Sequence, residues 1–150
     1  MSGRLTVWGA EQLLTAYFVG SAELPPSFWL ALVRATPPTP YMDGTELDEP
    51  DVVDFPDYAR IEIPNDGLNW ANDSTPQEIY NVLPAQFITA VTDWGQISYW
   101  ALCNAPVDGF NLLVGDLETP ILIQAGDQAV ISEGDLSVSL GPFFLVEEDS

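Results

Sequence analysis

The sequence predicts a mainly β protein: an antiparallel β-sandwich or barrel-like fold of about eight to nine strands, with one short N-terminal helix. Three observations predict this class. The chain has 150 residues, 47% of them hydrophobic, which is enough for one domain with a substantial core. Short apolar runs with period-two alternation recur after residue 27. Gly-Asp and Asp-Gly pairs, which are typical of turns, separate several of these runs.

Residues 1–22 are predicted to contain the one convincing helix. Its apolar stripe has helical spacing and consists of Ala10, Leu13, Leu14, Tyr17 and Phe18. Gly20 fits the left-handed position that ends a helix, and Pro25-Pro26 prevents its continuation. A helix of about ten residues is not stable alone in water, so the stripe either caps the sandwich or docks on another subunit. We expect residues 1–26 to be a docking element whose contact residues are Trp8, Leu13, Leu14, Tyr17 and Phe18.

Residues 27–150 are predicted to form the β domain. The strand candidates are residues 28–34, 57–63, 79–83, 86–91, 94–103, 110–117, 121–124, 128–131 and 136–140. Residues 94–103 are long and apolar, as expected for a central strand, so Trp94 and Trp100 are assigned to the core. Cys103 shares its alternation with Ile97 and is interpreted as a small buried hydrophobic residue.

The loop over residues 41–57 carries seven acidic side chains with little periodicity, and we expect it to be long and exposed. Carboxylates are ligands for Ca²⁺, so Asp43, Glu46, Asp48 and Asp51 are weak candidates for a calcium site. Their spacing does not match an EF-hand, and a solvated acidic surface is the favoured interpretation. We therefore expect no cofactor, with Ca²⁺ as the alternative.

The charge balance excludes several classes of function. Twenty-three acidic residues against Arg4, Arg34 and Arg60 give a formal net charge of −20, and the chain contains no Lys and no His. Such a surface repels nucleic acid and anionic membranes. Histidine- or lysine-based catalysis has no residues to use. Cys103 has no internal disulfide partner, and no apolar run approaches the roughly 18 residues of a membrane span.

Two further interpretations concern catalysis and ligand binding. Two carboxylates suffice for glycoside hydrolysis, but no pair stands out among 23 acids, so we expect no enzymatic activity. Five tryptophans leave open a carbohydrate-binding sandwich, which requires exposed Trp or Tyr rings beside Asp or Asn on a concave edge.

Arg60, a cation in a strongly negative field, is expected to form a structural ion pair with an acid of the 41–57 loop.

Several short sequence motifs resemble those of a known class of protein. The most specific motifs are Tyr58-Ala59-Arg60, Asp93-Trp94-Gly95 and Ala125-Gly126-Asp127. Further motifs are Trp29-Leu30-Ala31-Leu32, Asp43-Gly44-Thr45-Glu46, Asn111-Leu112-Leu113 and Leu117-Glu118-Thr119-Pro120. From the helix to Leu140 the chain resembles small tail-fibre-like virion structural proteins of tailed bacteriophages. The resemblance implies a β-rich, non-enzymatic protein with no catalytic residues.

The same resemblance implies a location and partners. The protein would assemble on the particle surface, as a tail fibre or minor tail component or as a capsid decoration, in virions built in the cytoplasm of the host bacterium. Its partners would be further copies of itself, with a trimer favoured by the likeness to fibres, and other virion proteins of the tail or capsid. The alternative function is a module that binds a carbohydrate of the host surface.

Overall fold

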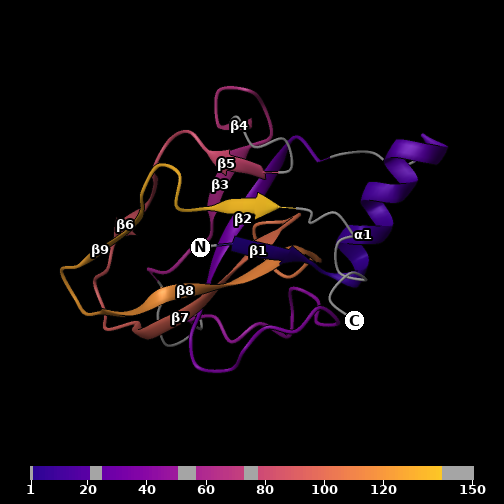
Figure 1. Cartoon of the computed structure of the whole chain (residues 1–150). Helices are drawn as coiled ribbons and strands as arrows, with labels where there is room; N and C mark the ends of the chain where they lie inside the picture. The colour runs from indigo at the N-terminus through magenta and orange to yellow at the C-terminus, as the bar shows by residue number, and fades with distance from the viewer. Residues whose placement is uncertain (1, 21–24, 51–56, 73–77, 140–150) are drawn as a thin grey trace, which may run out of the picture.

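A computed structural model describes residues 2–20, 25–50, 57–72 and 78–139. This part of the chain contains ten β-strands, the helix α1 (Val7–Leu14) and a π-helical turn, η1 (Thr15–Val19), that continues it (Figure 1). The predicted fold class, mainly β with one short N-terminal helix, is confirmed.

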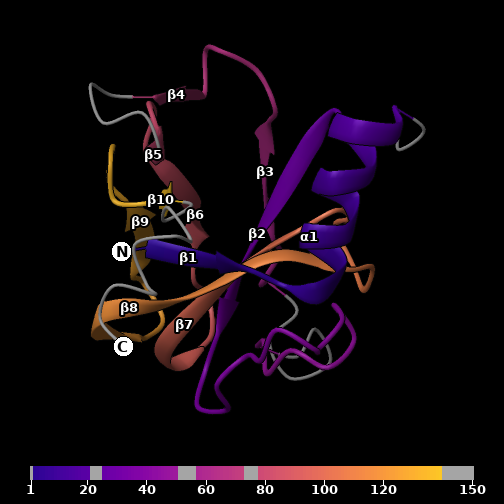
Figure 2. The ribbon, with the colours of Figure 1, turned by 45° about the vertical axis from the view of Figure 1, so that its right-hand side comes forward.

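Eight strands form one curled sheet in the order β3-β2-β7-β8-β1-β10-β5-β4. Their bounds are β1 Ser2–Leu5, β2 Ser27–Val33, β3 Ile61–Pro64, β4 Trp70–Asn72, β5 Glu78–Asn81, β7 Gly95–Cys103, β8 Asn111–Ile123 and β10 Ser137–Ser139. All described pairs are antiparallel except β1 with β10. The sheet curls so that β2 and β3 stand opposite β4 and β5 (Figure 2), but edge strands β3 and β4 do not pair and the barrel stays open.

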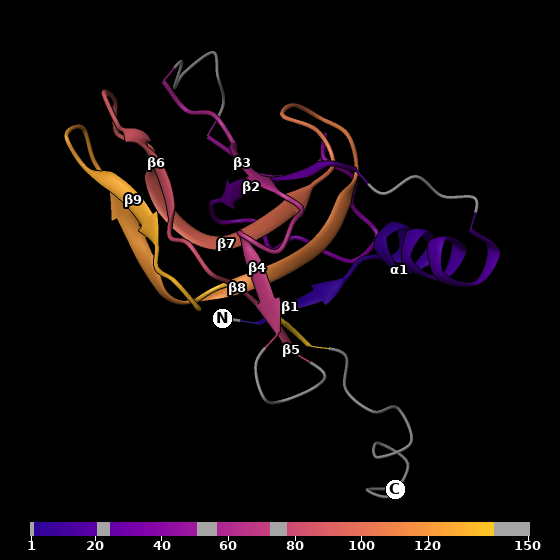
Figure 3. The same cartoon turned by 90° about the horizontal axis from the view of Figure 1, so that it is seen from above.

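The two remaining strands, β6 (Ala85–Thr89) and β9 (Gln128–Ile131), pair with each other in a small separate sheet. Their inward side chains enter the core enclosed by the large sheet. Figure 3 shows β6 and β9 on the opposite side of the molecule from α1. The helix therefore stands apart from this main core.

The observed strands differ from the predicted ones in several places, and the strand predicted over residues 57–63 is β3, which begins at Ile61. β1 lies within the segment predicted as helix, and β4 lies in a polar segment for which no strand was predicted. The predicted strands 110–117 and 121–124 are one continuous strand, β8. β1 and β4 are four and three residues long and owe their conformation to neighbouring strands, so their own sequences carry little β signal.

The main core is organised around Trp100, which is fully buried. Trp100 pairs in register with Gly115 on β8, and Gly115 pairs with Gly3 on β1, so the three residues form a row across the sheet. A Cβ atom on Gly3 or Gly115 would lie 2.4 or 2.6 Å from the indole ring. The two glycines thus leave the space in which the ring lies.

The pairing of β7 with β8 has a register shift between Ile97 and Tyr99. Residues before and after this shift therefore do not follow one regular alternation of faces. Ile97 packs in the main core, whereas Ala101 and Cys103 belong to a second apolar cluster on the other face. The expectation that Ile97 and Cys103 share one face was therefore wrong, because regular alternation does not anticipate a β-bulge. Trp94 and Trp100 are both fully buried, as expected for core residues.

The second cluster is covered by the acidic loop, which corrects the prediction that residues 41–57 are exposed. Leu47 packs on the second cluster, and Gly44 and Pro50 are buried. Gly44 donates a hydrogen bond from its amide to the carbonyl of Gly109, at 2.8 Å. The part of the loop that the structure describes, residues 41–50, is therefore a covering layer on the outer face of the sheet, and residues 51–56 lie outside the described chain.

Candidate docking surface and the Arg60 network

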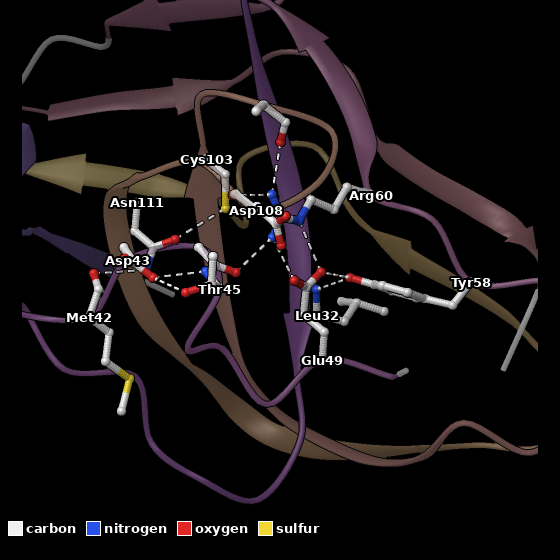
Figure 4. A network of polar contacts seen from close by, with 12 residues as sticks. Leu32, Met42, Asp43, Thr45, Glu49, Tyr58, Arg60, Cys103, Asp108 and Asn111 are labelled. Atoms are coloured by element: carbon white, nitrogen blue, oxygen red, sulfur yellow. Dashed lines mark hydrogen bonds and ion pairs between the residues drawn. The ribbon is translucent and has the colours of Figure 1, made fainter. Parts of the chain in front are cut away.

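A buried polar network centred on Arg60 holds the acidic loop against the sheet (Figure 4). The side chain of Arg60 is 3% exposed, and its guanidinium forms a bidentate ion pair with Glu49. The Nη2 atom lies 2.6 Å from Oε1, and the Nε atom lies 3.0 Å from Oε2. Such paired, charge-assisted hydrogen bonds are strong and directional. The expected pairing of Arg60 with an acid of the loop is present, and Glu49 is the partner.

Arg60 also binds the main chain of two further segments. Its Nη1 atom donates to the carbonyls of Ala105 and Asp108 at 2.8 and 3.0 Å, and Nη2 donates to the carbonyl of Gly44 at 3.2 Å. The Tyr58 hydroxyl donates to Glu49 at 2.6 Å. One buried cation thereby joins the acidic loop, the turn between β7 and β8, and the chain entering β3.

Burial and neighbouring charges shift the pKa values of three groups in and beside this network. Burial opposes the charge of Arg60, but the hydrogen bonds and charge of Glu49 outweigh it and raise the pKa of the guanidinium. Burial, together with the charge of Glu49, raises the pKa of Tyr58 well above its ordinary value. Burial likewise raises the pKa of Cys103 to about 12, so its thiol stays protonated. The hydrogen bonds of this network join three segments of the chain.

Three of the four calcium candidates, Asp43, Glu46 and Asp48, lie in the described chain, and each accepts hydrogen bonds from the protein. Asp43 accepts hydrogen bonds from the amide and hydroxyl of Thr45, and Glu46 accepts one from the Asp43 amide. Asp48 instead accepts hydrogen bonds from the backbone after β2, and Asp51 lies outside the described residues. Within the described ranges, no three acidic, Cys or His side chains are grouped so that they could hold a metal ion. The carboxylates of this loop shape the loop itself.

A second carboxylate, Asp57, is a structural centre that the sequence did not reveal. It accepts hydrogen bonds from the Val91 amide at 2.6 Å, the Thr92 hydroxyl at 2.7 Å and the Trp94 indole at 3.1 Å. Burial opposes the charge, but the Thr92 and main-chain hydrogen bonds outweigh it and lower the pKa of Asp57 to about 2. Its partners lie 34 to 37 residues away in sequence, so local spacing gives no signal for them.

The first turn of α1 is tied firmly to the sheet. Thr6 caps the helix by accepting a hydrogen bond from the Gly9 amide at 2.9 Å, and its hydroxyl donates to the carbonyl of Asn111. Trp8 stacks on Phe110 with ring centroids 5.2 Å apart. A Cβ atom on Gly9 would lie 2.3 Å from the Leu112 carbonyl, so only glycine allows this close approach of α1 to β8.

Beyond this anchor the helix extends away from the strands (Figures 1 and 3). Gly9 is the one buried residue of α1, and η1 has none. The apolar side chains in the second half of the helix are between 40% and 81% exposed: Leu13, Leu14, Tyr17, Phe18 and Val19. These five residues are called the helix face below. The helix ends as predicted, at Gly20 in the left-handed conformation with φ 72°.

The structure therefore divides the five predicted docking residues. Trp8 packs within the chain at the base of the helix, whereas Leu13, Leu14, Tyr17 and Phe18 lie together on the helix face. The stripe does not cap the described core. Val19 was not predicted as a contact residue, because it falls outside the α-helical spacing of the stripe; it is the last residue of η1 and is 72% exposed.

The fold, the Arg60 network and the helix face define a class. It is a mainly β structural protein with an internal polar network and an apolar helix face that is exposed within the chain. A family model described as Podophage GP4 fiber I protein gp80 matches residues 4–139. The chain belongs to this family of phage fibre proteins, which confirms the resemblance seen in its sequence motifs. No curated protein matches the chain. In the described chain, no helix has the length and apolar character needed to cross a membrane.

Proposed function

We propose that this protein is a non-enzymatic fibre component on the surface of a phage virion, and that its copies associate through the helix face. Membership of a phage fibre family supports the virion role. The observation that carries the mode of assembly is the exposure of Tyr17, Phe18 and Val19, which are 81%, 78% and 72% exposed. The Tyr17 and Phe18 rings are neighbours, with centroids 5.3 Å apart, and exposed apolar patches of this kind are typical of interaction sites.

The occupant proposed for the helix face is a second copy of the same chain. Residues 2–20 contain one cation, Arg4, and one acid, Glu11, so their formal net charge is zero in a chain of −20. Most other surfaces would bring acidic side chains of two copies together and repel. The helix is where two identical, strongly acidic molecules approach with the least repulsion, and a trimer suits the fibre resemblance.

Burial of the helix face supplies the favourable term for association. Removing apolar side chains from water is the main driving force of most protein–protein contacts. It has to exceed the loss of translational and rotational freedom, and packing several helices together buries more apolar area per copy.

Sedimentation equilibrium tests the proposal with a matched pair of double variants. Tyr17→Ser with Phe18→Ser changes the helix face, and Tyr41→Ser with Val91→Ser changes two side chains of similar exposure, 84% and 74%, elsewhere. We expect oligomers for the wild type and the control, and monomers for the helix variant with an unchanged melting temperature. A wild type that is monomeric at every concentration refutes self-association and leaves another virion protein as the occupant.

A further inference from the structure

The last described strand directs the chain that follows it towards the helix. β1 and β10 pair in parallel, with Ser2 opposite Ser137 and Gly3 opposite Val138. Figure 1 shows the indigo arrow of β1 and the yellow arrow of β10 pointing the same way, and β1 leads directly into α1. The chain therefore leaves β10, after Ser139, in the direction of the helix face.

The residues after Ser139 lie outside the described chain, and their sequence has an apolar and an acidic part. Residues 143–146 are Phe-Phe-Leu-Val, and residues 147–149, which follow directly, are Glu-Glu-Asp. Residues 143–146 are called the tail segment below. Pro142, just before them, has no amide hydrogen and cannot donate to the ladder of β10. Four consecutive apolar side chains gain free energy when they leave water for another apolar surface.

The tail segment is far enough along the chain to reach the helix face. The register of the two strands, continued by one residue, brings Ser139 level with Arg4. From that level, two extended residues and the helical rise put Leu13 at most about 18 Å away and Val19 at most about 27 Å away. The tail segment lies four to seven residues beyond Ser139, which an extended chain spans in about 13–25 Å. The two ranges overlap over most of the helix face.

The helix face suits this segment in shape and in charge. The neighbouring rings of Tyr17 and Phe18 are largely exposed and offer area against which aromatic and aliphatic side chains can pack. Residues 2–20 have a formal net charge of zero in a chain of −20. Residues 147–149 therefore meet less repulsion at the helix than they would beside an acidic surface.

From these observations we propose that the tail segment covers the helix face of its own chain until a second copy displaces it. This inference rests on the proposed function, because it concerns how association through the helix face is regulated. In the covered state, residues 147–149 bring three negative charges to the place where another acidic copy must approach. The apparent affinity between copies is then reduced by the fraction of chains whose helix face is covered.

Disulfide trapping in dilute solution tests the contact within one chain. Val19→Cys with Glu147→Cys places one thiol on the helix face and one directly after the tail segment. In the control, Thr119→Cys with Glu147→Cys, the first thiol lies on an exposed part of β8, which runs antiparallel to β1 and leads away from the helix. The native Cys103 is buried and takes no part. We expect the intramolecular disulfide to form about tenfold faster in the Val19 pair, because docking raises the local concentration of the two thiols.

Sedimentation equilibrium measures the effect of the tail segment on assembly. Phe143→Ser with Phe144→Ser removes its aromatic half, and Tyr41→Ser with Val91→Ser is the matched control at exposed positions elsewhere. We expect the tail variant to associate about tenfold more tightly than the wild type, which corresponds to a helix face covered in about nine-tenths of the free chains. The control should associate as the wild type does.

Three results would overturn this inference and leave the proposed function standing. The first is equal disulfide formation in the Val19 and Thr119 pairs. The second is a tail variant that associates no more tightly than the wild type. The third is a disulfide of the Val19 pair that forms only between chains, because the tail segment would then contact a neighbouring copy. Monomers for the wild type and the tail variant alike would instead refute the proposed function, and the regulation with it.

Discussion

The acidic loop and the N-terminal helix differ in composition, and the burial of each is the opposite of what its composition suggests. Residues 41–50 are acidic and were expected in solvent, yet the loop is fixed on the sheet by Arg60 and Leu47. The helix is apolar and was expected to be covered, yet most of its apolar side chains are exposed within the chain. Composition therefore does not decide which segment is buried. A single buried cation can hold an acidic loop on a sheet, and an apolar helix can stay exposed within its own chain.

The largest effect should come from removing the acidic partner of Arg60. Glu49→Ala leaves a guanidinium buried without its counter-charge, which typically costs about 3–5 kcal/mol of stability. Glu62→Ala, at an exposed residue of β3, is the control and should change stability by less than about 0.5 kcal/mol. Urea unfolding measures both variants. Equal, small losses would mean that the loop does not depend on the ion pair.

The anchor of the helix gives the next largest effect. Gly9→Ala places a Cβ atom 2.3 Å from the Leu112 carbonyl, and the strain of such overpacking is typically about 1–3 kcal/mol. Gly67→Ala is a control, because a Cβ atom there has no neighbour within 4 Å. Thermal unfolding should show a lower melting temperature for Gly9→Ala alone. If both variants melt alike, the helix is not held by this close approach.

A smaller effect concerns acid stability. Asp57 has an ordinary pKa of 3.8 and a folded pKa of about 2, so it binds protons less readily when folded. Its contribution to stability is therefore complete above pH 4 and is lost as the pH falls from about 4 towards 2. Measured by urea unfolding, Asp57→Asn should show a flatter pH dependence than the wild type over this window. Parallel curves for the two proteins would contradict the role of Asp57.

Residue patterns predicted much of the fold, for reasons that are local. The apolar runs of β2 and β7 mark strands, and the apolar stripe with Gly20 marks the helix and its end. β1 escaped prediction because its pairing with β8 and β10 is tertiary. The register shift after Ile97 escaped because nothing in the composition shows that residue 98 of β7 faces residues 117–120 of β8.

The Arg60 network could be predicted only in part from the sequence. The scarcity of cations made Arg60 conspicuous, and its pairing with an acid followed from the surrounding charge. Which acid pairs with it did not follow, since seven compete in one segment. The placement of the loop over the outer face did not follow either, since no spacing in the sequence encodes it.

Chemical cross-linking between copies tests most directly whether the helix face, and not another exposed surface, is the contact. Val19→Cys places a thiol on the helix face, and Thr119→Cys places one on an exposed part of β8. The native Cys103 is buried with a pKa of about 12 and does not react with a short bismaleimide reagent. The account predicts covalently linked dimers for Val19→Cys and monomers for Thr119→Cys. A Val19→Cys protein that stays as monomeric as its control would contradict it.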